Sequence, residues 1–115
     1  MHDVTIRHNP ARHRFEVMTS GTVIGKAVYT EYDGGASPER IFYHTVINEE
    51  YGGQGLAGKL AKVALTETVE SGRAIVAVCP YIKKYVRKHP EFAEAAVAIT
   101  PAHLEFLNDA LAARA

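Results

Sequence analysis

Apolar and polar residues alternate along most of the first half of the chain. The apolar positions fall into four groups, which include Val4 and Ile6, Phe15 and Val17, Val23 with Ala27 and Tyr29, and Ile41 to Val46. The breaks between the groups carry residues that favour turns, namely Asn9-Pro10, Ser20-Gly21 and Asp33-Gly34-Gly35. A period of two with short breaks predicts four strands in an antiparallel meander, because a parallel pair needs a much longer connection.

The period changes in the second half of the chain. From Leu56 to about Ser71 the apolar residues recur at helical spacing, and Gly72 is a suitable stop. The run 74–79 is then continuously apolar, which is typical of a strand covered on both faces, and it must lie parallel to the strand before the helix. We therefore predict an α+β, sandwich-like fold with a mixed, mostly antiparallel sheet of about five to six strands.

Two further helices are expected near the C-terminal end. Pro80 begins a short amphipathic helix that stops at His89-Pro90, and Thr100 with Pro101 marks the start of a last helix. The polar side of the first of these helices carries four cations, Lys83, Lys84, Arg87 and Lys88. These cations could neutralise a phosphate group of a ligand, but for most of them we expect a solvated face.

Composition narrows the class of protein. The 115 residues suit a single domain, 1–115, and 47% apolar residues with a net charge of +0 favour neither disorder nor a nucleic-acid partner. The single cysteine excludes an internal disulfide, and without Cys or His pairs at finger spacing no metal is expected. No apolar run approaches the roughly 20 residues of a membrane span. We expect a cytoplasmic protein, a monomer or weak homodimer, with no membrane partner.

A glycine-rich turn joins the fourth predicted strand to the first helix. Glycines let successive amides turn inward, and the start of the helix adds free N–H groups and the positive end of its dipole. Such a turn is suited to phosphate. The candidate phosphate-binding residues are Gly52, Gly53, Gln54, Gly55, Leu56, Ala57, Gly58 and Lys59.

Two nucleotide-binding motifs match this turn as text, but their surroundings argue against both. The stretch 53–58 fits the dinucleotide pattern G-x-G-x-x-G, yet the next strand ends at Val78-Cys79 without the acidic residue that holds a ribose. The stretch 53–59 fits the start of an NTPase loop, but Leu60 has no hydroxyl to offer to magnesium. A nucleotide-binding domain therefore stays the weakest alternative.

The same turn resembles that of the GNAT superfamily of acyl-CoA N-acyltransferases. In that family a Q/R-x-x-G-x-G/A turn binds the pyrophosphate of coenzyme A, and Gly55 and Ala57 stand at its last two positions. Gly52 stands where Arg or Gln is usual, as in a small, single-domain branch of the family. The resemblance covers about 4–92 and implies a strand, glycine turn, helix and strand core. The segment 93–115 is then a C-terminal extension, which we expect to be helical.

The resemblance also implies roles for single residues. The pantetheine arm of acetyl-CoA would lie against the backbone of Val46 and Ile47 like an extra strand, with the parallel strands splayed around it. His44 is the candidate general base, because imidazole titrates near neutral pH. Cys79 is either a covalent acyl carrier or a small apolar residue of the acyl pocket. Tyr85 is the candidate acid for the leaving thiolate, or part of the core.

We therefore expect an N-acetyltransferase that transfers acetyl from acetyl-CoA to an amine. The alternative is a binding module that holds coenzyme A or an acyl-CoA without turnover, since no carboxylate stands out as a base. No side-chain pattern in the sequence identifies the acceptor amine.

Overall fold

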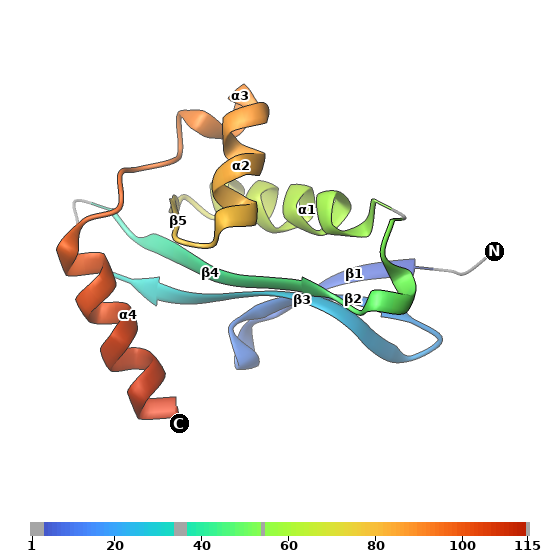
Figure 1. Ribbon diagram of the computed structural model, residues 1–115. Helices are drawn as coiled ribbons and strands as arrows, with labels where there is room; N and C mark the ends of the chain where they lie inside the picture. Colours follow the sequence, from blue (N-terminus) through green and yellow to red (C-terminus); the bar gives the residue numbers. More distant parts are fainter. Residues whose placement is uncertain (1–3, 34–36, 54, 115) are drawn as a thin grey trace.

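The computed structural model describes residues 4–33, 37–53 and 55–114 (Figure 1). In chain order the elements are β1 (Val4–Asn9), η1 (Pro10–Arg12), β2 (Arg14–Thr19), β3 (Thr22–Tyr32), β4 (Glu39–Ile47), η2 (Glu49–Tyr51), α1 (Leu56–Glu70), β5 (Ala74–Ala77), α2 (Pro80–Lys88), α3 (Pro90–Ala93) and α4 (Pro101–Arg114). The short helices η1, η2 and α3 were not expected from the pattern of the sequence.

The strands form one sheet in the order β1-β2-β3-β4-β5. The first four pair antiparallel and β5 pairs parallel to β4, so the predicted mixed sheet and α+β class are confirmed. The strand β5 is shorter than the apolar run 74–79. The reason is that the amides of Val78 and Cys79 both donate to the carbonyl of Phe42, where the chain leaves the sheet and enters α2.

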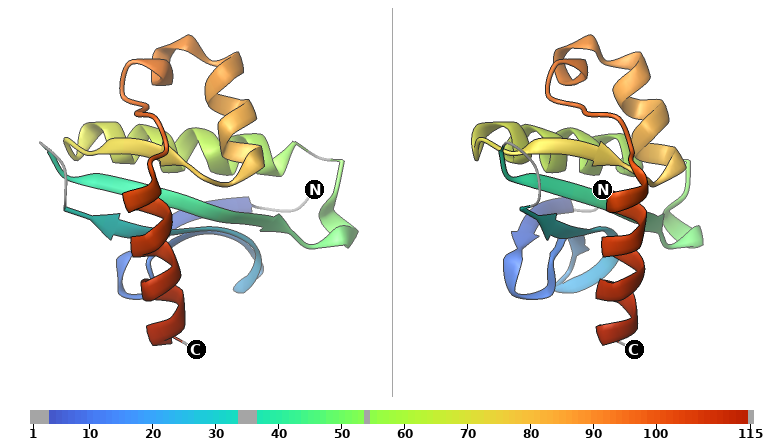
Figure 2. Two further views of the ribbon diagram at one scale, coloured as in Figure 1. Left: turned by 60° about the vertical axis from the view of Figure 1, so that its left-hand side comes forward. Right: turned by 90° about the vertical axis from the view of Figure 1, so that its left-hand side faces the viewer.

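The sheet has two unlike faces. Helices α1 and α2 cover what we call the helix face, where Phe15, Tyr29 and Phe42 pack against Leu60 and Leu65 of α1. The other side is the open face, which α4 meets near the Glu39 end of β4, through a small cluster of Ile41, Val76 and Leu107 and through ring contacts with Tyr32 of β3. Figure 2 shows α4 extending past the sheet, away from α1 and α2. None of the helices in the described ranges has the length and apolarity needed to cross a membrane.

A bulge in β4 decides which of its side chains reach each face. The register with β3 shifts between Val28 and Tyr29, so that Tyr43 is an extra residue in β4. Without it, His44 would share the face of Phe42. With it, Thr45 joins the helix face, and His44 lies on the open face opposite Val28.

Candidate functional site

The turn between β4 and α1 needs glycine for its backbone rather than for space. Gly53 has a φ of 80° and Gly55 a φ of 73°, a left-handed region that other residues enter at a cost. A Cβ at either position would meet no atom within 4 Å. The predicted Gln54 lies outside the described residues. The glycines therefore fix the direction in which the chain enters α1.

Helix α1 begins without a side-chain cap. Its N-cap is Gly55, no side chain bonds the first amides, and the first turn holds no acidic residue. The amide of Lys59 makes the first bond of the helix, to the carbonyl of Gly55, which leaves the amides of Leu56, Ala57 and Gly58 directed out of the helix end. Such an end attracts an anion through both its N–H groups and its dipole.

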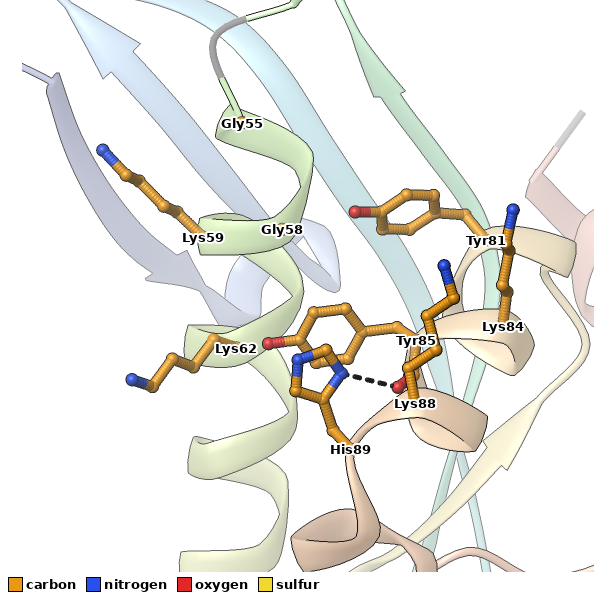
Figure 3. Close-up of a pocket in the computed structure, with 9 residues that line it drawn as sticks. All are labelled: Gly55, Gly58, Lys59, Lys62, Tyr81, Lys84, Tyr85, Lys88 and His89. Carbon is orange, nitrogen blue, oxygen red and sulfur yellow. Dashed lines mark hydrogen bonds between the residues drawn. The ribbon is translucent and has the colours of Figure 1, made fainter.

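Two neighbouring cavities open beside this turn. The smaller, of about 260 Å³, lies against the turn itself and is lined by Ile47, Tyr51, Gly52, Gly53, Gly55, Leu56, Ala57, Gly58 and Tyr81. The larger, of about 580 Å³, runs between α1 and α2 and is lined by Gly55, Gly58, Lys59, Lys62, Tyr81, Lys84, Tyr85, Lys88 and His89 (Figure 3). We call it the lysine groove. The two cavities share the lining residues Gly55, Gly58 and Tyr81, so they lie next to each other at the start of α1.

Three rings, two from α2 and one from its C-cap residue His89, form one wall of the lysine groove. Tyr81, Tyr85 and His89 follow each other at one-turn spacing, with ring centroids 6.5 Å apart for the tyrosines and 3.9 Å apart for the stacked Tyr85 and His89. His89 donates from Nδ1 to the carbonyl of Tyr85 at 2.8 Å. Figure 3 shows both tyrosine hydroxyls pointing toward α1. Burial raises the pKa of Tyr81 and of Tyr85, so both remain protonated at neutral pH.

The groove concentrates positive charge. Lys59 and Lys62 line the groove from α1 and Lys84 and Lys88 line it from α2, and Figure 3 shows the side chains of Lys59 and Lys62 extending from α1 away from the rings. Its described lining holds no carboxylate. The basic face of α2 is therefore divided, because Lys84 and Lys88 line the groove whereas Lys83 lines a separate cavity beside the 96–99 segment. A groove of this charge suits a ligand with several phosphate charges.

The strands β4 and β5 part just below the glycine turn. They pair along Glu39–Phe42, and β4 then continues to Ile47 with β3 as its partner strand. The stretch 43–47 consequently has an edge that β5 does not cover. Val46 and Ile47, the predicted backbone contacts of a pantetheine arm, belong to this stretch. Their side chains face opposite ways: Ile47 lines the cavity at the turn, and Val46 is 40% exposed on the open face.

Cys79 stands where the two strands part. It is the N-cap residue of α2, is 5% exposed, and its Sγ donates to Oγ1 of Thr45 at 3.5 Å. His44 is the neighbour of Thr45 but is exposed on the open face. Cys79 and His44 therefore lie beside the same part of β4 but on opposite faces of the sheet.

Comparison of the sequence with known proteins identifies the family of this chain. The family model for GCN5-related N-acetyl-transferase matches residues 14–95, which is most of the chain. This chain belongs to the GCN5-related N-acetyltransferase family. The matched region begins later than the resemblance expected from the sequence, at the start of β2, and ends just after α3.

Several vertebrate proteins are relatives of this chain. It is 34% identical to "Protein NATD1" of Mus musculus over 89 residues, which cover 76% of this chain and 77% of the relative. It is 30% identical to "Protein NATD1" of Xenopus tropicalis over 87 residues, which cover 76% and 78% of the two chains. The family resemblance proposed from the glycine turn is thus confirmed.

A solved structure supports the fold. The ribosomal-protein-alanine N-acetyltransferase from Brucella melitensis biovar Abortus 2308 matches with a TM-score of 0.54 and 17% sequence identity. The match covers 76% of this chain and 62% of the solved one, so this chain spans less than two thirds of that enzyme's length. At this identity the likeness shows the fold alone.

Members of the acetyltransferase family generally use acetyl-CoA, and the site described above fits that cosubstrate. The uncapped start of α1 suits a pyrophosphate, and the lysine groove beside it suits further phosphate. Within the described ranges no group of three or more His, Cys, Asp or Glu side chains is arranged to hold a metal ion.

Several residues of this acetyltransferase-family site were missed by the sequence reading. Tyr81, Lys62 and His89 all line the lysine groove. The signal for the rings was present, because Tyr81, Tyr85 and His89 share an i, i+4, i+8 spacing that places them on one side of a helix. Lys62 could not be assigned, because nothing in the sequence tells which side of α1 faces α2.

Proposed function

We propose that the chain is an N-acetyltransferase that moves the acetyl group of acetyl-CoA to an amine. The observation that carries the proposal is the uncapped start of α1, built on Gly53 and Gly55 at positive φ and opening directly into the lysine groove. Helix α2 also begins without a side-chain cap, so what distinguishes α1 is that its free amides follow two glycines at positive φ and face the lysine groove. These amides become satisfied when an anion such as pyrophosphate accepts from them.

The lysine groove would hold the nucleotide end of the same molecule. Lys59 and Lys62 from α1 and Lys84 and Lys88 from α2 would balance the phosphate charges. The uncovered edge of β4, at Val46 and Ile47, would bind the pantetheine arm through backbone groups. The molecule would thus be held from its phosphates to its thioester.

Acetyl-CoA supplies an activated thioester, and the chain must then orient it and move protons. An oriented amide near Val46 would polarise the carbonyl without reorganising. The acceptor nitrogen forms a bond to the carbonyl carbon as the carbon–sulfur bond breaks. His44 would take the proton that the amine loses, and a tyrosine hydroxyl, Tyr85 or its neighbour Tyr81, would donate the proton that the departing sulfur gains.

Cys79 has two roles open to it within this proposal. Its sulfur lies beside the parting of β4 and β5 and bonds Thr45, so it either lines the acyl pocket or takes the acetyl group itself before the amine does. Mass spectrometry after mixing with acetyl-CoA alone would separate these roles, because a covalent carrier gains one acetyl group on the peptide that contains Cys79.

The test combines binding with turnover. Lys84→Glu places a negative charge in the lysine groove, whereas Arg87→Glu makes the same charge change on the same helix outside its lining. We expect acetyl-CoA to raise the melting temperature of the parent and of Arg87→Glu, and to do so much less for Lys84→Glu. Release of free thiol in the presence of an amine panel should follow the same order.

Two outcomes would revise the proposal. Binding of acetyl-CoA without thiol release from any amine would favour the alternative, a module that holds coenzyme A without turnover. Equal stabilisation of all three proteins by acetyl-CoA would remove the lysine groove from the site altogether.

A further inference from the structure

The open face of the sheet carries a further cavity that the proposed function leaves unused. It has a volume of about 180 Å³ and is lined by Arg14, Val23, Gly25, Lys26, Val46 and Asn48. It lies on the far side of the sheet from the lysine groove. We call it the open-face pocket.

The charges around the open-face pocket do not cancel. Glu16 is 1% exposed and accepts from Arg7 at 2.7 Å and from Arg14 at 2.6 Å. Burial alone would raise the pKa of Glu16, but the bonds from Arg7, Arg14 and Asn9 outweigh it and hold the pKa below its usual value. The single carboxylate of Glu16 thus accepts hydrogen bonds from two guanidinium groups.

Lys26 adds a further cation beside that carboxylate. It faces Glu16 across the β2–β3 ladder and Val46 across the β3–β4 ladder, and within the described part of the chain no ion-pair partner is found for it. The described lining of the pocket contains no carboxylate. Arg14 and Lys26 therefore leave this pocket net positive and ready to pair with an anion.

The strand register places the pocket next to the candidate base. Arg14, Val28 and His44 lie opposite one another on β2, β3 and β4, and Lys26 is the diagonal neighbour of His44. Diagonal cross-strand neighbours lie about 7 to 8 Å apart, within reach of long side chains. An amine at His44 and an anionic group at Lys26 and Arg14 can therefore belong to one small molecule.

The route of the acetyl group leads to the same face. In the proposed function the cosubstrate binds on the helix face, and its arm lies at the uncovered edge of β4. Helices α1 and α2 close the helix face above that edge, so an acceptor meets the thioester from the open face, where His44 and Val46 are exposed.

We propose that the acceptor is an amine that also carries a carboxylate, and that Arg14 and Lys26 bind this carboxylate while the amine lies at His44. The inference rests on the proposed function and names its substrate class. Arg14 is already oriented by Glu16, so binding needs little rearrangement. Lys26 supplies the second charge, for which the described residues provide no ion-pair partner.

The experiment compares three acceptors of equal carbon number: δ-aminovalerate, pentylamine and cadaverine. Besides one amine, δ-aminovalerate carries a carboxylate, pentylamine carries no further charged group, and cadaverine carries a second amine. We expect kcat/KM for thiol release from acetyl-CoA to be roughly tenfold higher with δ-aminovalerate than with pentylamine, which corresponds to one carboxylate contact of about 1.4 kcal/mol. Cadaverine should be the poorest acceptor of the three.

Lys26→Glu tests the assignment directly. This variant should invert the order, with cadaverine best and δ-aminovalerate poorest, while its affinity for acetyl-CoA stays unchanged because Lys26 lies on the opposite face from the lysine groove. Arg12→Glu is the matched control, since Arg12 is an exposed cation that does not line the pocket. It should keep the parent's order.

A second readout separates this inference from the proposed function. In NMR spectra δ-aminovalerate should shift the amide signals of Lys26, Val46 and Asn48 in the parent and leave them unchanged in Lys26→Glu. If no amine is acetylated but these shifts appear, the proposed function fails and the carboxylate site stands. If amines are acetylated with no preference for the carboxylate, or if the shifts are absent, the inference is overturned while acetyl transfer is not.

Discussion

The two faces of the sheet are held by different kinds of anchor, although the anchors come from adjacent residues of β4. On the helix face Arg40 is 2% exposed and bonds Glu31, Glu67 and Thr68, with its guanidinium 4.4 Å from the ring centre of Tyr29. On the open face Glu39 accepts a single bond from Nε2 of His103, at 2.6 Å. Helix α1 is therefore held to the sheet by a buried charged network, whereas α4 is held by this one bond, by Leu107 and by ring contacts with Tyr32.

This difference matches what each face is proposed to do. The helix face must aim the amides at the start of α1 at a phosphate, and a multiply bonded anchor at the far end of α1 keeps that helix in place. The open face must admit and release an acceptor, so most of it stays uncovered. Rigidity and access are thus divided between the two sides of one sheet.

The largest effect is expected from Arg40→Ala. It removes the guanidinium that joins β4 to α1 and leaves two carboxylates facing a cavity, at a cost of about 3 kcal/mol in the free energy of unfolding. The carboxylates of Glu31 and Glu67 are more than a third exposed and regain water, which keeps the loss from being larger. Urea unfolding measures it.

Arg73→Ala is the matched control for Arg40. Arg73 bonds the same Glu31 at 3.1 Å but is 32% exposed, so its loss should cost at most about 1 kcal/mol. Equal losses for the two variants would show that the buried position of Arg40 adds nothing to the anchor.

The next effect concerns the glycine turn. Gly55→Ala forces a side chain into the left-handed region at a cost of about 1 to 2 kcal/mol, and relief of this strain should tilt the first amides of α1. We expect acetyl-CoA affinity, measured by calorimetry, to fall about tenfold, which is about 1.4 kcal/mol.

Gly58→Ala separates strain from bulk. Gly58 is helical, and a Cβ there would make an ordinary contact of 3.7 Å with the Tyr81 hydroxyl. This variant should be more stable by up to about 1 kcal/mol, because alanine favours the helix. If Gly55→Ala binds as tightly as Gly58→Ala, backbone strain is not what builds the turn.

The turn and the order of the elements were readable from the sequence, whereas the open face was not. Glycine at positive φ leaves a mark in the sequence, because few other residues tolerate that conformation. The period of two and the helical period gave five strands and the helices α1, α2 and α4. Local chemistry fixes each of these features.

The open-face pocket depends on register instead. Strict alternation from Phe42 would put His44 on the helix face, and the extra residue Tyr43 reverses this. Arg14 and Lys26 come together with Val46 only when three strands are aligned. No local pattern in the sequence marks such a bulge, so the meeting of these side chains could not be predicted.

A smaller effect is expected at the anchor of α4. Nδ1 of His103 accepts from the amide of Thr100 at 3.0 Å, so Nε2 must carry the proton that is donated to Glu39. Glu39→Gln keeps an acceptor and should leave stability nearly unchanged, whereas Glu39→Met should cost about 1 kcal/mol. Protease cleavage within α4 should speed up for Glu39→Met alone, and equal rates for both variants would rule out this bond as the anchor.

The smallest effect is the pH dependence that distinguishes the faces. Burial, with a smaller contribution from Arg40, lowers the pKa of His8 on the helix face below its ordinary 6.5 despite the opposing charge of Glu67. The unfolded chain then binds a proton more readily than the folded one, so stability is complete above pH 6.5 and falls as pH drops toward the folded pKa. The lowered pKa of Glu16 on the open face has the same sign, but acts below pH 4.5.

His8→Asn tests this separation of the two faces. The variant removes the titrating ring that stacks on Phe15, so it should be less stable at neutral pH yet lose less stability between about pH 6.5 and pH 5. Urea unfolding of both proteins across this range gives the two slopes. Glu16→Gln should leave the slope in this window as it is in the parent, because its carboxyl titrates lower. If His8→Asn loses as much stability as the parent between these pH values, another histidine causes the acid sensitivity. The helix face would then not respond to acid before the open face does.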